Sequence, residues 1–282
     1  MARRMNTRVV VVIGAGGIGQ AIARRQGSGN TVLLADRNPT TLAAAAETLQ
    51  AAGHTVTTRP VDVASRDSVH ALAQAAAELG DVVNVIHTAG LSPVQASPQA
   101  ILAVDLVGVA LVLEEFGQVI APGGAGVVIS SMAGYMQPSL DSEAEHILAQ
   151  TPTDQLLQQQ LLAPAAVPSS GAAYALAKRA NHLRVQAAAV TWGERGARIN
   201  SISPGIILTP LARDEMAGPG SQGYQRMIET SAAGRVGTTD EVASAAAYLL
   251  GSEAGFVTGA DLLIDGGVIA ALRAGRLQLQ PR

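Results

Sequence analysis

The chain of 282 residues contains no cysteine. That absence excludes disulfide bridges, a thiolate zinc site and a cysteine nucleophile. Aromatic residues make up only 2 % of the chain, so the core must be built from Ala, Val, Ile and Leu. Charged residues are also few, at 15 % against 48 % hydrophobic residues, and this balance excludes intrinsic disorder.

Neither sign of charge is concentrated in a block. The net charge is −3, the pI is about 5.9 and the mean hydropathy is +0.25, so we expect no nucleic-acid partner and no attraction to an anionic membrane. No apolar run approaches the roughly 18 residues of a membrane span. The basic start lacks the apolar run and cleavage site of a signal peptide. We therefore expect a cytoplasmic protein that acts on small molecules.

Short β-branched runs alternate with longer Ala- and Leu-rich segments, which is typical of a parallel sheet with crossover helices. The expected strands cover residues 8–13, 31–35, 55–59, 82–87, 126–130, 197–203 and 261–264. The expected helices cover residues 18–26, 39–52, 66–79, 98–120, 171–193 and 239–250. No repeat or linker divides the chain. We expect one α/β domain over residues 1–282, a Rossmann-type doubly wound parallel sheet of about seven strands flanked by helices.

Residues 134–172 interrupt this alternation. Two stretches in this insertion, 142–150 and 153–162, have helical spacing, with Ser142 and Thr153 as expected caps. A long excursion in a compact domain is often a lid or binding loop. We expect the leucines between residues 156 and 162 to form an apolar edge over the substrate, and a neutral surface insertion is the alternative.

A glycine-rich turn follows the first expected strand. Gly14, Gly16 and Gly19 form G-x-G-x-x-G at the start of a helix, where free N–H groups favour a pyrophosphate. Asp36 ends the next strand about 20 residues later, where a carboxylate can bond the ribose hydroxyls of a dinucleotide. Asp36 favours NAD(H), whereas the neighbouring Arg37 could attract the 2′-phosphate of NADP(H). We favour NAD(H) and keep NADP(H) possible.

Tyr174 and Lys178 lie four positions apart and therefore share one face of the expected helix. A nearby ammonium lowers the pKa of a tyrosine from about 10 toward the range of a general acid/base. Lys178 is the only lysine of the chain, among 18 arginines. The retention of lysine at this one place indicates a functional pair.

These motifs identify the chain as similar to the classical short-chain dehydrogenase/reductases over residues 9–267. The resemblance implies that Ser131 polarises the substrate oxygen, Tyr174 relays its proton and Lys178 holds the nicotinamide ribose. Further residues implied to contact the cofactor are Gly17 and Ile18 of the turn, Asp62, Val63, Ala89, Gly90, Pro204, Gly205, Ile207 and Thr209.

The chain departs from the family pattern in three respects. His87-Thr88 stands where a pair of asparagines is common. The glycine turn is one residue shorter than usual, with Ile13 before it. Asp105 occupies the place of an Asn that, in the family, helps to anchor a water chain leading from the lysine. Asp donates no hydrogen bond unless it is protonated, so we expect a rearranged relay, or else a buried Asp that pairs with a backbone donor.

The helix expected over residues 98–120 is apolar almost all round, which suggests burial beyond its own sheet. The family often forms tetramers through this helix, although an insertion before the tyrosine obstructs that contact in some relatives. We therefore expect a homodimer or a homotetramer.

The five histidines show no metal-ligand spacing, so we expect no metal. The preferred function is NAD(P)(H)-dependent interconversion of a secondary alcohol and a ketone, with a small apolar substrate. The alternatives are a dinucleotide-binding protein without turnover and a redox-neutral isomerase or dehydratase. The candidate walls of the substrate pocket are Ser92, Tyr135, Met136, Ile206, Leu211 and Met216.

Overall fold

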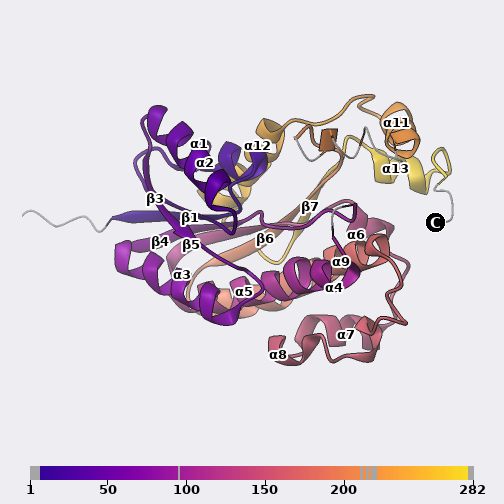
Figure 1. Ribbon diagram of the computed structural model, residues 1–282, viewed down its shortest axis with the longest axis horizontal. Coiled ribbons are helices and arrows are strands. Elements are labelled where there is room, and N and C mark those ends of the chain that lie inside the picture. The colour runs from indigo at the N-terminus through magenta and orange to yellow at the C-terminus, as the bar shows by residue number, and fades with distance from the viewer. Residues whose placement is uncertain (1–6, 95, 210–211, 214–215, 217–220, 279–282) are drawn as a thin grey trace, which may run out of the picture.

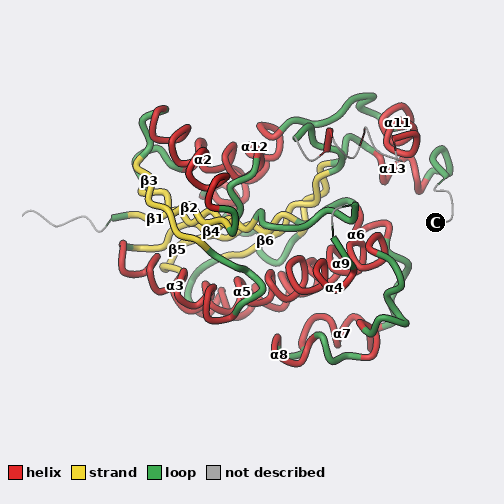
Figure 2. The backbone as a smooth tube through the Cα atoms, viewed as in Figure 1, coloured by secondary structure: helices red, strands yellow, loops and turns green. Residues whose placement is uncertain are grey.

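Seven parallel strands form a single sheet in a computed structural model that describes residues 7–94, 96–209, 212–213, 216 and 221–278. The order is β3-β2-β1-β4-β5-β6-β7 (Figure 1, Figure 2). The strands are β1 Arg8–Ile13, β2 Thr31–Asp36, β3 Thr55–Pro60, β4 Asp81–His87, β5 Ile120–Ile129, β6 Arg198–Pro204 and β7 Asp261–Ile264. The expected doubly wound sheet is confirmed. The strand order reverses between β1 and β4, the point at which such sheets bind ligands at their carboxyl edge.

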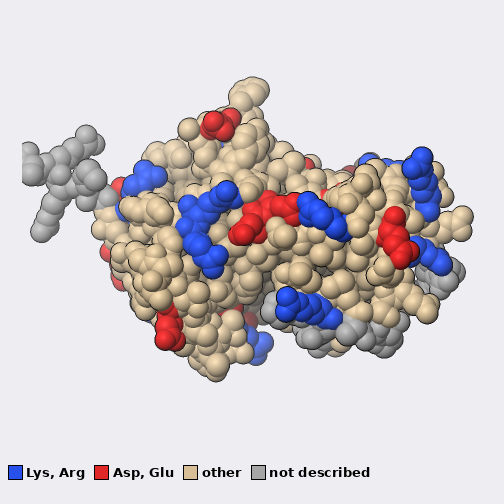
Figure 3. Space-filling model, turned by 90° about the horizontal axis from the view of Figure 1, so that it is seen from above, with Lys and Arg blue, Asp and Glu red and all other residues tan. Residues whose placement is uncertain are grey.

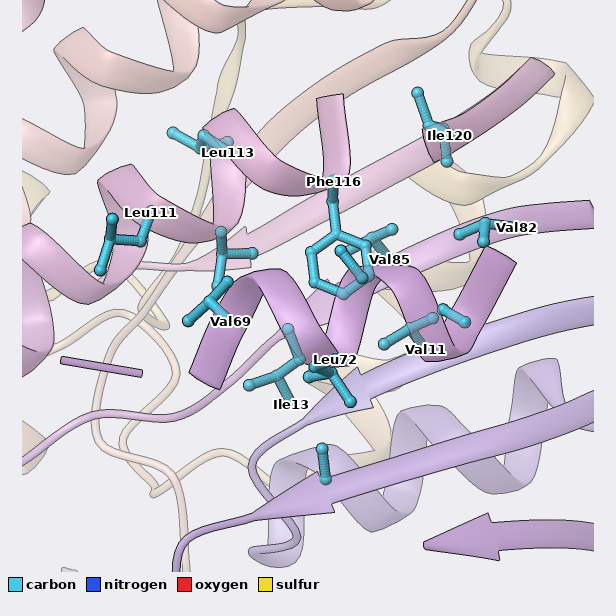
Figure 4. Close-up of a cluster of buried hydrophobic side chains, with 14 of the residues drawn as sticks. Val11, Ile13, Val69, Leu72, Val82, Val85, Leu111, Leu113, Phe116 and Ile120 are labelled. Carbon is cyan, nitrogen blue, oxygen red and sulfur yellow. The ribbon is translucent and has the colours of Figure 1, made fainter. Parts of the chain in front are cut away.

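Two layers of helices cover the sheet (Figure 1). One layer contains α1 Gly17–Gln26, α2 Pro39–Ala51 and α12 Thr239–Leu250, and the other contains α3 Arg66–Leu79, α5 Gly108–Val119 and α9 Ser170–Glu194. Val10 and Val12 of β1 pack toward the first layer, whereas Val11 and Ile13 pack toward the second. Figure 4 shows Phe116 among the side chains of the second interface. Burial on both faces explains why the central strand β1 is apolar without alternation.

The helix expected over residues 98–120 consists of three pieces. Ser97 caps α4 Pro98–Ile101, a π-helix spans Leu102–Val107, and α5 ends at Val119. β5 begins at Ile120, six residues before the expected start. The π-helical turn inserts an extra residue, which an apolar sequence pattern does not reveal.

The insertion is largely helical, with different caps from those expected. It follows α6 Ala133–Met136 and contains α7 Ser142–Gln150, α8 Thr153–Leu156 and a 3-10 turn at Gln160–Leu162. Asp141, not Ser142, caps α7 by accepting from the Ala144 N–H. The Thr153 hydroxyl donates to Glu114 instead of capping α8, which ends well before residue 162.

α7 and α8 form an extra layer on the outer side of α4 and α9 (Figure 1). Their buried leucines, Leu148 and Leu156, pack in one cluster with Ile101 and Leu106 of the α4–π-helix segment and with Leu183 of α9. The insertion therefore supplies the cover that the apolar helix requires. That helix does not by itself demand a second subunit. Leu156 and Leu162 are buried in this cluster, and Tyr174 packs against it as well.

Arg66 ties α8 to the rest of the fold. Its guanidinium lies 3.0 Å from Asp154 of α8, 2.9 Å from Glu114 and 3.1 Å from Glu115 of α5. Arg184 of α9 also donates to the Thr151 carbonyl, between α7 and α8. The insertion is thus held by polar contacts at its rim as well as by its leucines.

The carboxyl-terminal part of the chain packs beside the end of β5. Residues of α11 Ser221–Thr230 and α13 Val268–Arg273 share a fourth apolar cluster with Met132, Tyr135 and Ile206. A 3-10 turn at Ser252–Ala254 precedes β7. This cluster borders the carboxyl edge of the sheet, where the candidate site lies.

The packing of the insertion predicts unequal effects of two similar substitutions. Leu148 is fully buried, so Leu148→Ala should lower the free energy of unfolding by about 2–5 kcal/mol. Leu157 is 46 % exposed, and Leu157→Ala should change that free energy by less than about 0.5 kcal/mol. Urea denaturation of both variants checks this. Equal effects would contradict the docking of α7 on α9.

Buried His87 predicts a pH dependence of stability. Burial and then the charge of Lys178 lower the pKa of His87 to about 3, against about 6.5 in the unfolded chain. The unfolded state therefore binds the proton first as the pH falls below 6.5, and the native state loses stability. Between pH 7 and pH 5 this loss should be about 2 kcal/mol.

The measurement is urea denaturation of wild type and His87→Gln at several pH values. The exposed His146→Gln serves as the matched control and should keep the wild-type slope. A wild-type slope in His87→Gln would show that His87 does not carry this dependence.

Candidate active site

Three glycines of the turn after β1 have different structural roles. Gly14 has φ +104° and packs so tightly that a Cβ would lie 2.5 Å from the Thr88 hydroxyl. A Cβ on Gly19 would lie 2.0 Å from the Gly14 carbonyl oxygen, so this glycine allows α1 to pack on β1. No atom lies within 4 Å of a Cβ built on Gly16, which leaves space there for a ligand.

The start of α1 fits the pyrophosphate of a dinucleotide. Gly16 is the N-cap residue and no side chain caps the helix, so its first N–H groups can bond an anion. Gly17 is bordered by the methyl groups of Thr239 and Thr209, which would lie 3.4 and 3.7 Å from a Cβ on this glycine. The structure thus brings Thr209 and Thr239 to the turn, and the sequence did not indicate Thr239.

Asp36 lies at the end of β2, beside the turn. Its carboxylate accepts the Ala15 N–H at 2.7 Å and the Asn38 N–H at 2.8 Å. Arg37 is 78 % exposed and lies 3.8 Å from the carboxylate of Asp62. Asp36 therefore fixes the turn through its bond to Ala15, and its carboxylate lies beside that turn.

Several residues that were expected to contact the cofactor have buried side chains or are held by backbone hydrogen bonds. The side chains of Val63 and Ile207 are buried, and Ile18 packs against the core. The Ala89 N–H donates to the Ile13 carbonyl, which fixes the end of β4 next to the turn. At the end of β6, Pro204 accepts from the Met132 N–H and Gly205 donates to the Ile264 carbonyl.

Tyr174 and Lys178 lie one turn apart near the start of α9. The Lys178 ammonium lies 5.2 Å from the centre of the Tyr174 ring. Burial alone lowers the pKa of Lys178, but Asp105 and Tyr174 outweigh it and raise that pKa above its ordinary value. Lys178 is therefore a buried, charged ammonium beside the tyrosine.

Asp105 contacts Lys178 directly. Its Oδ1 lies 3.1 Å from the lysine Nζ, and its carboxylate accepts the Leu91 N–H at 3.1–3.2 Å. Burial raises the pKa of Asp105, while Lys178 and the Leu91 amide oppose that rise. Gly90 allows the contact, because a Cβ there would lie 2.5 Å from Oδ1. The alternative of a buried Asp that pairs with a backbone donor is what the structure shows, with a direct contact to Lys178 in addition.

The two serines after β5 have different partners. The buried Ser130 hydroxyl donates to the Lys178 carbonyl at 2.9 Å, which ties the end of β5 to α9. The half-buried Ser131 hydroxyl accepts the Ala133 N–H at 3.2 Å. Ser131 thus lies between β5 and α6, and its hydroxyl oxygen accepts a hydrogen bond from the first residue of α6.

A polar network next to α6 was not indicated by the sequence. The Tyr135 hydroxyl donates to Asp261 of β7 at 2.8 Å, and Ser201 and Ser203 also bond this carboxylate. His182 of α9 lies 2.8 Å from the Ser203 hydroxyl. Burial raises the pKa of Tyr135 above its usual range. The network connects α6, α9 and β7, so Tyr135 is a structural contact as well as a candidate pocket wall.

The four methionines of the described chain gather beside this site. Met132, Met136, Met216 and Met227 all belong to the cluster that contains Ile206, Tyr135 and Tyr224. Met132 directly follows Ser131 in sequence. Of the other expected pocket walls, Ser92 is buried and accepts the Val94 N–H, and Leu211 lies outside the described residues.

The surface in Figure 3 carries charged side chains in small groups of both signs, separated by uncharged areas. Among the described residues, no group of three or more His, Asp or Glu side chains could hold a metal ion. No helix within the described part of the chain is long and apolar enough to cross a membrane.

Comparison with known proteins agrees with this geometry. Residues 8–142 match the family model "short chain dehydrogenase", and residues 142–269 match "Enoyl-(Acyl carrier protein) reductase". The chain is 43 % identical over 274 residues to the short-chain dehydrogenase/reductase bsc3 of Alternaria brassicicola, covering 95 % of this chain and 98 % of the relative. It is 29 % identical to D-threitol dehydrogenase of Mycolicibacterium smegmatis, covering 94 % of each protein.

Solved structures give the same result. The crystal structure of levodione reductase superposes with a TM-score of 0.75 at 25 % identity, covering 95 % of this chain and 100 % of that one. Short-chain dehydrogenase/reductases use NAD(P)(H) as their cofactor. With its seven-stranded sheet, its glycine turn and a full-length relative at 43 % identity, the chain belongs to the short-chain dehydrogenase/reductase family of oxidoreductases.

Proposed function

We propose that this protein interconverts a secondary alcohol and a ketone with NAD(P)(H), with Tyr174 as the general acid/base. The observation that carries the proposal is the buried Lys178 ammonium, 5.2 Å from the centre of the Tyr174 ring. A positive charge at this distance favours the phenolate and brings the tyrosine toward the working range of an acid/base group. The names of the relatives, dehydrogenases and reductases, support the same reaction class.

Ser131 is the proposed partner of the substrate oxygen. The Ser130 hydroxyl is occupied by the Lys178 carbonyl, whereas Ser131 lies at the junction of β5 and α6 with its hydroxyl proton free of the Ala133 contact. In the reductive direction Ser131 donates a hydrogen bond to the developing oxyanion and Tyr174 delivers the proton. A bound nicotinamide would supply or accept the hydride.

The glycine turn, Gly90 and the Pro204–Thr209 segment would hold the dinucleotide. NAD(H) is the favoured form because the Asp36 carboxylate would repel a 2′-phosphate. Arg37 lies farther out and interacts with Asp62, which weakens the argument that it serves a phosphate.

The substrate is proposed to be apolar. Methionine side chains adapt their shape and carry no charge. Four of them lie in the cluster that contains Met132, the residue after Ser131, together with two tyrosines and three isoleucines. Such walls suit a carbonyl or alcohol on a hydrocarbon frame and penalise charged substrates, whose desolvation they would not offset.

Replacement of Tyr174 tests the reaction. Tyr174→Phe removes the proton donor and keeps the ring, so turnover of an alcohol or ketone substrate should fall by about 10² to 10⁴. NADH binding, measured by fluorescence titration, should persist. Tyr248→Phe, at an exposed tyrosine of α12, is the matched control and should keep full activity. Near-normal turnover by Tyr174→Phe would contradict the assignment.

Replacement of Asp36 tests the cofactor preference. Asp36→Ala removes both the charge and the bond to Ala15. It should therefore weaken NADH binding and reduce the ratio of NADH affinity to NADPH affinity. The exposed Asp67→Ala, at the start of α3, should change neither affinity. Titration of both cofactors gives the result, and unchanged affinities in Asp36→Ala would exclude a ribose contact.

A further inference from the structure

The ammonium of Lys178 has a neighbour of opposite charge that is sealed from solvent. Asp105 is 0 % exposed, and its Oδ1 lies 3.1 Å from Nζ of a lysine that is itself only 4 % exposed. Two charges removed from water lose much of their hydration free energy. A hydrophobic pair could fill this space without that loss, so the retained pair points to a role in the site.

The surrounding backbone is arranged for this contact. Asp105 lies in the π-helix Leu102–Val107, and the Leu91 N–H donates to its carboxylate. The bare backbone of Gly90 leaves room for Oδ1, since a Cβ would come within 2.5 Å of it. The carboxylate is therefore fixed on the lysine by three elements: the residues after β4, the π-helix and α9.

We propose that Asp105 is a positioning residue that holds Lys178 and offsets its charge toward Tyr174, and so sets the pH range in which Tyr174 works. The inference rests on the proposed acid/base role of Tyr174. The same lysine without a paired carboxylate would stabilise the phenolate more strongly. The pair thus shifts the tyrosine toward weaker acidity and makes alcohol oxidation favour more alkaline pH.

Other titratable groups face this region and are accounted for. His87 of β4 is neutral, because burial lowers its pKa to about 3. His182 of α9 also has a lowered pKa through burial, and it interacts with Asp261. Arg179 is paired with Glu145 of α7. Of these groups, Asp105 alone places a negative charge on Lys178.

The test is Asp105→Asn, which keeps the size and an oxygen for the Leu91 N–H but removes the charge. The acidic limb of kcat/KM for alcohol oxidation should move to lower pH by about one unit, because the unpaired ammonium lowers the pKa of Tyr174. Glu145→Gln removes an equal charge next to Arg179 in a partly exposed place and should keep the wild-type profile.

A second readout needs no substrate. Tyrosinate absorbance is titrated in each protein and in its Tyr174→Phe counterpart, and the difference gives the ionisation of Tyr174. It should occur at lower pH in Asp105→Asn than in wild type. If Asp105→Asn does not fold, Gly90→Ala, whose methyl group would displace the carboxylate from Nζ, should give a smaller shift of the same sign.

An unshifted profile and an unshifted titration in folded variants would overturn the role of Asp105 and leave the proposed function standing. A uniform loss of activity without a shift would also overturn it, since this is the effect of a purely structural contact. An inactive wild type, by contrast, would contradict the proposed function and this inference with it.

Discussion

The burial of α9 on several sides is the constraint on which the site depends. Val185 and Trp192 pack against the sheet, Leu183 packs against the insertion and His182 reaches β6. A helix fixed in this way cannot rotate, so Tyr174 and Lys178 keep their direction toward the carboxyl edge. The Ser130 hydroxyl donates to the Lys178 carbonyl, so the end of β5 and α9 are fixed relative to each other.

The insertion strengthens this constraint. Without the insertion, the side of α9 that faces away from the sheet would meet solvent or another subunit. Here α7 and α8 cover the first half of that side within the same chain. Arg66, Arg184 and Arg179 hold the rim of this layer to α5 and α9. We infer that this layer supports the rigidity of the site.

Much of the fold could be predicted from sequence, because β-branched runs indicate buried strands and the turn residues that bound them indicate where each strand ends. The residues that come together at the candidate site could be predicted only where they lie within a short motif, as Gly14, Gly16 and Gly19 do, and as Tyr174 and Lys178 do. The π-helix at Leu102–Val107 could not, because one extra residue in a turn leaves the apolar pattern intact. Nor could the contact of Asp105 with Lys178, which joins side chains 73 residues apart, or the bond from Ala15 to Asp36.

The central claim is that this rigid site moves a hydride between a dinucleotide and an apolar carbonyl. The most direct measurement mixes the enzyme with NADH carrying deuterium at nicotinamide C4 and a panel of apolar cyclic ketones, and follows the label by mass spectrometry. We predict deuterium at the carbinol carbon of the product alcohol, and its loss with Tyr174→Phe. Tight binding of NADH and NADPH with no labelled alcohol from any ketone, and no oxidation of the matching alcohols, would contradict the account.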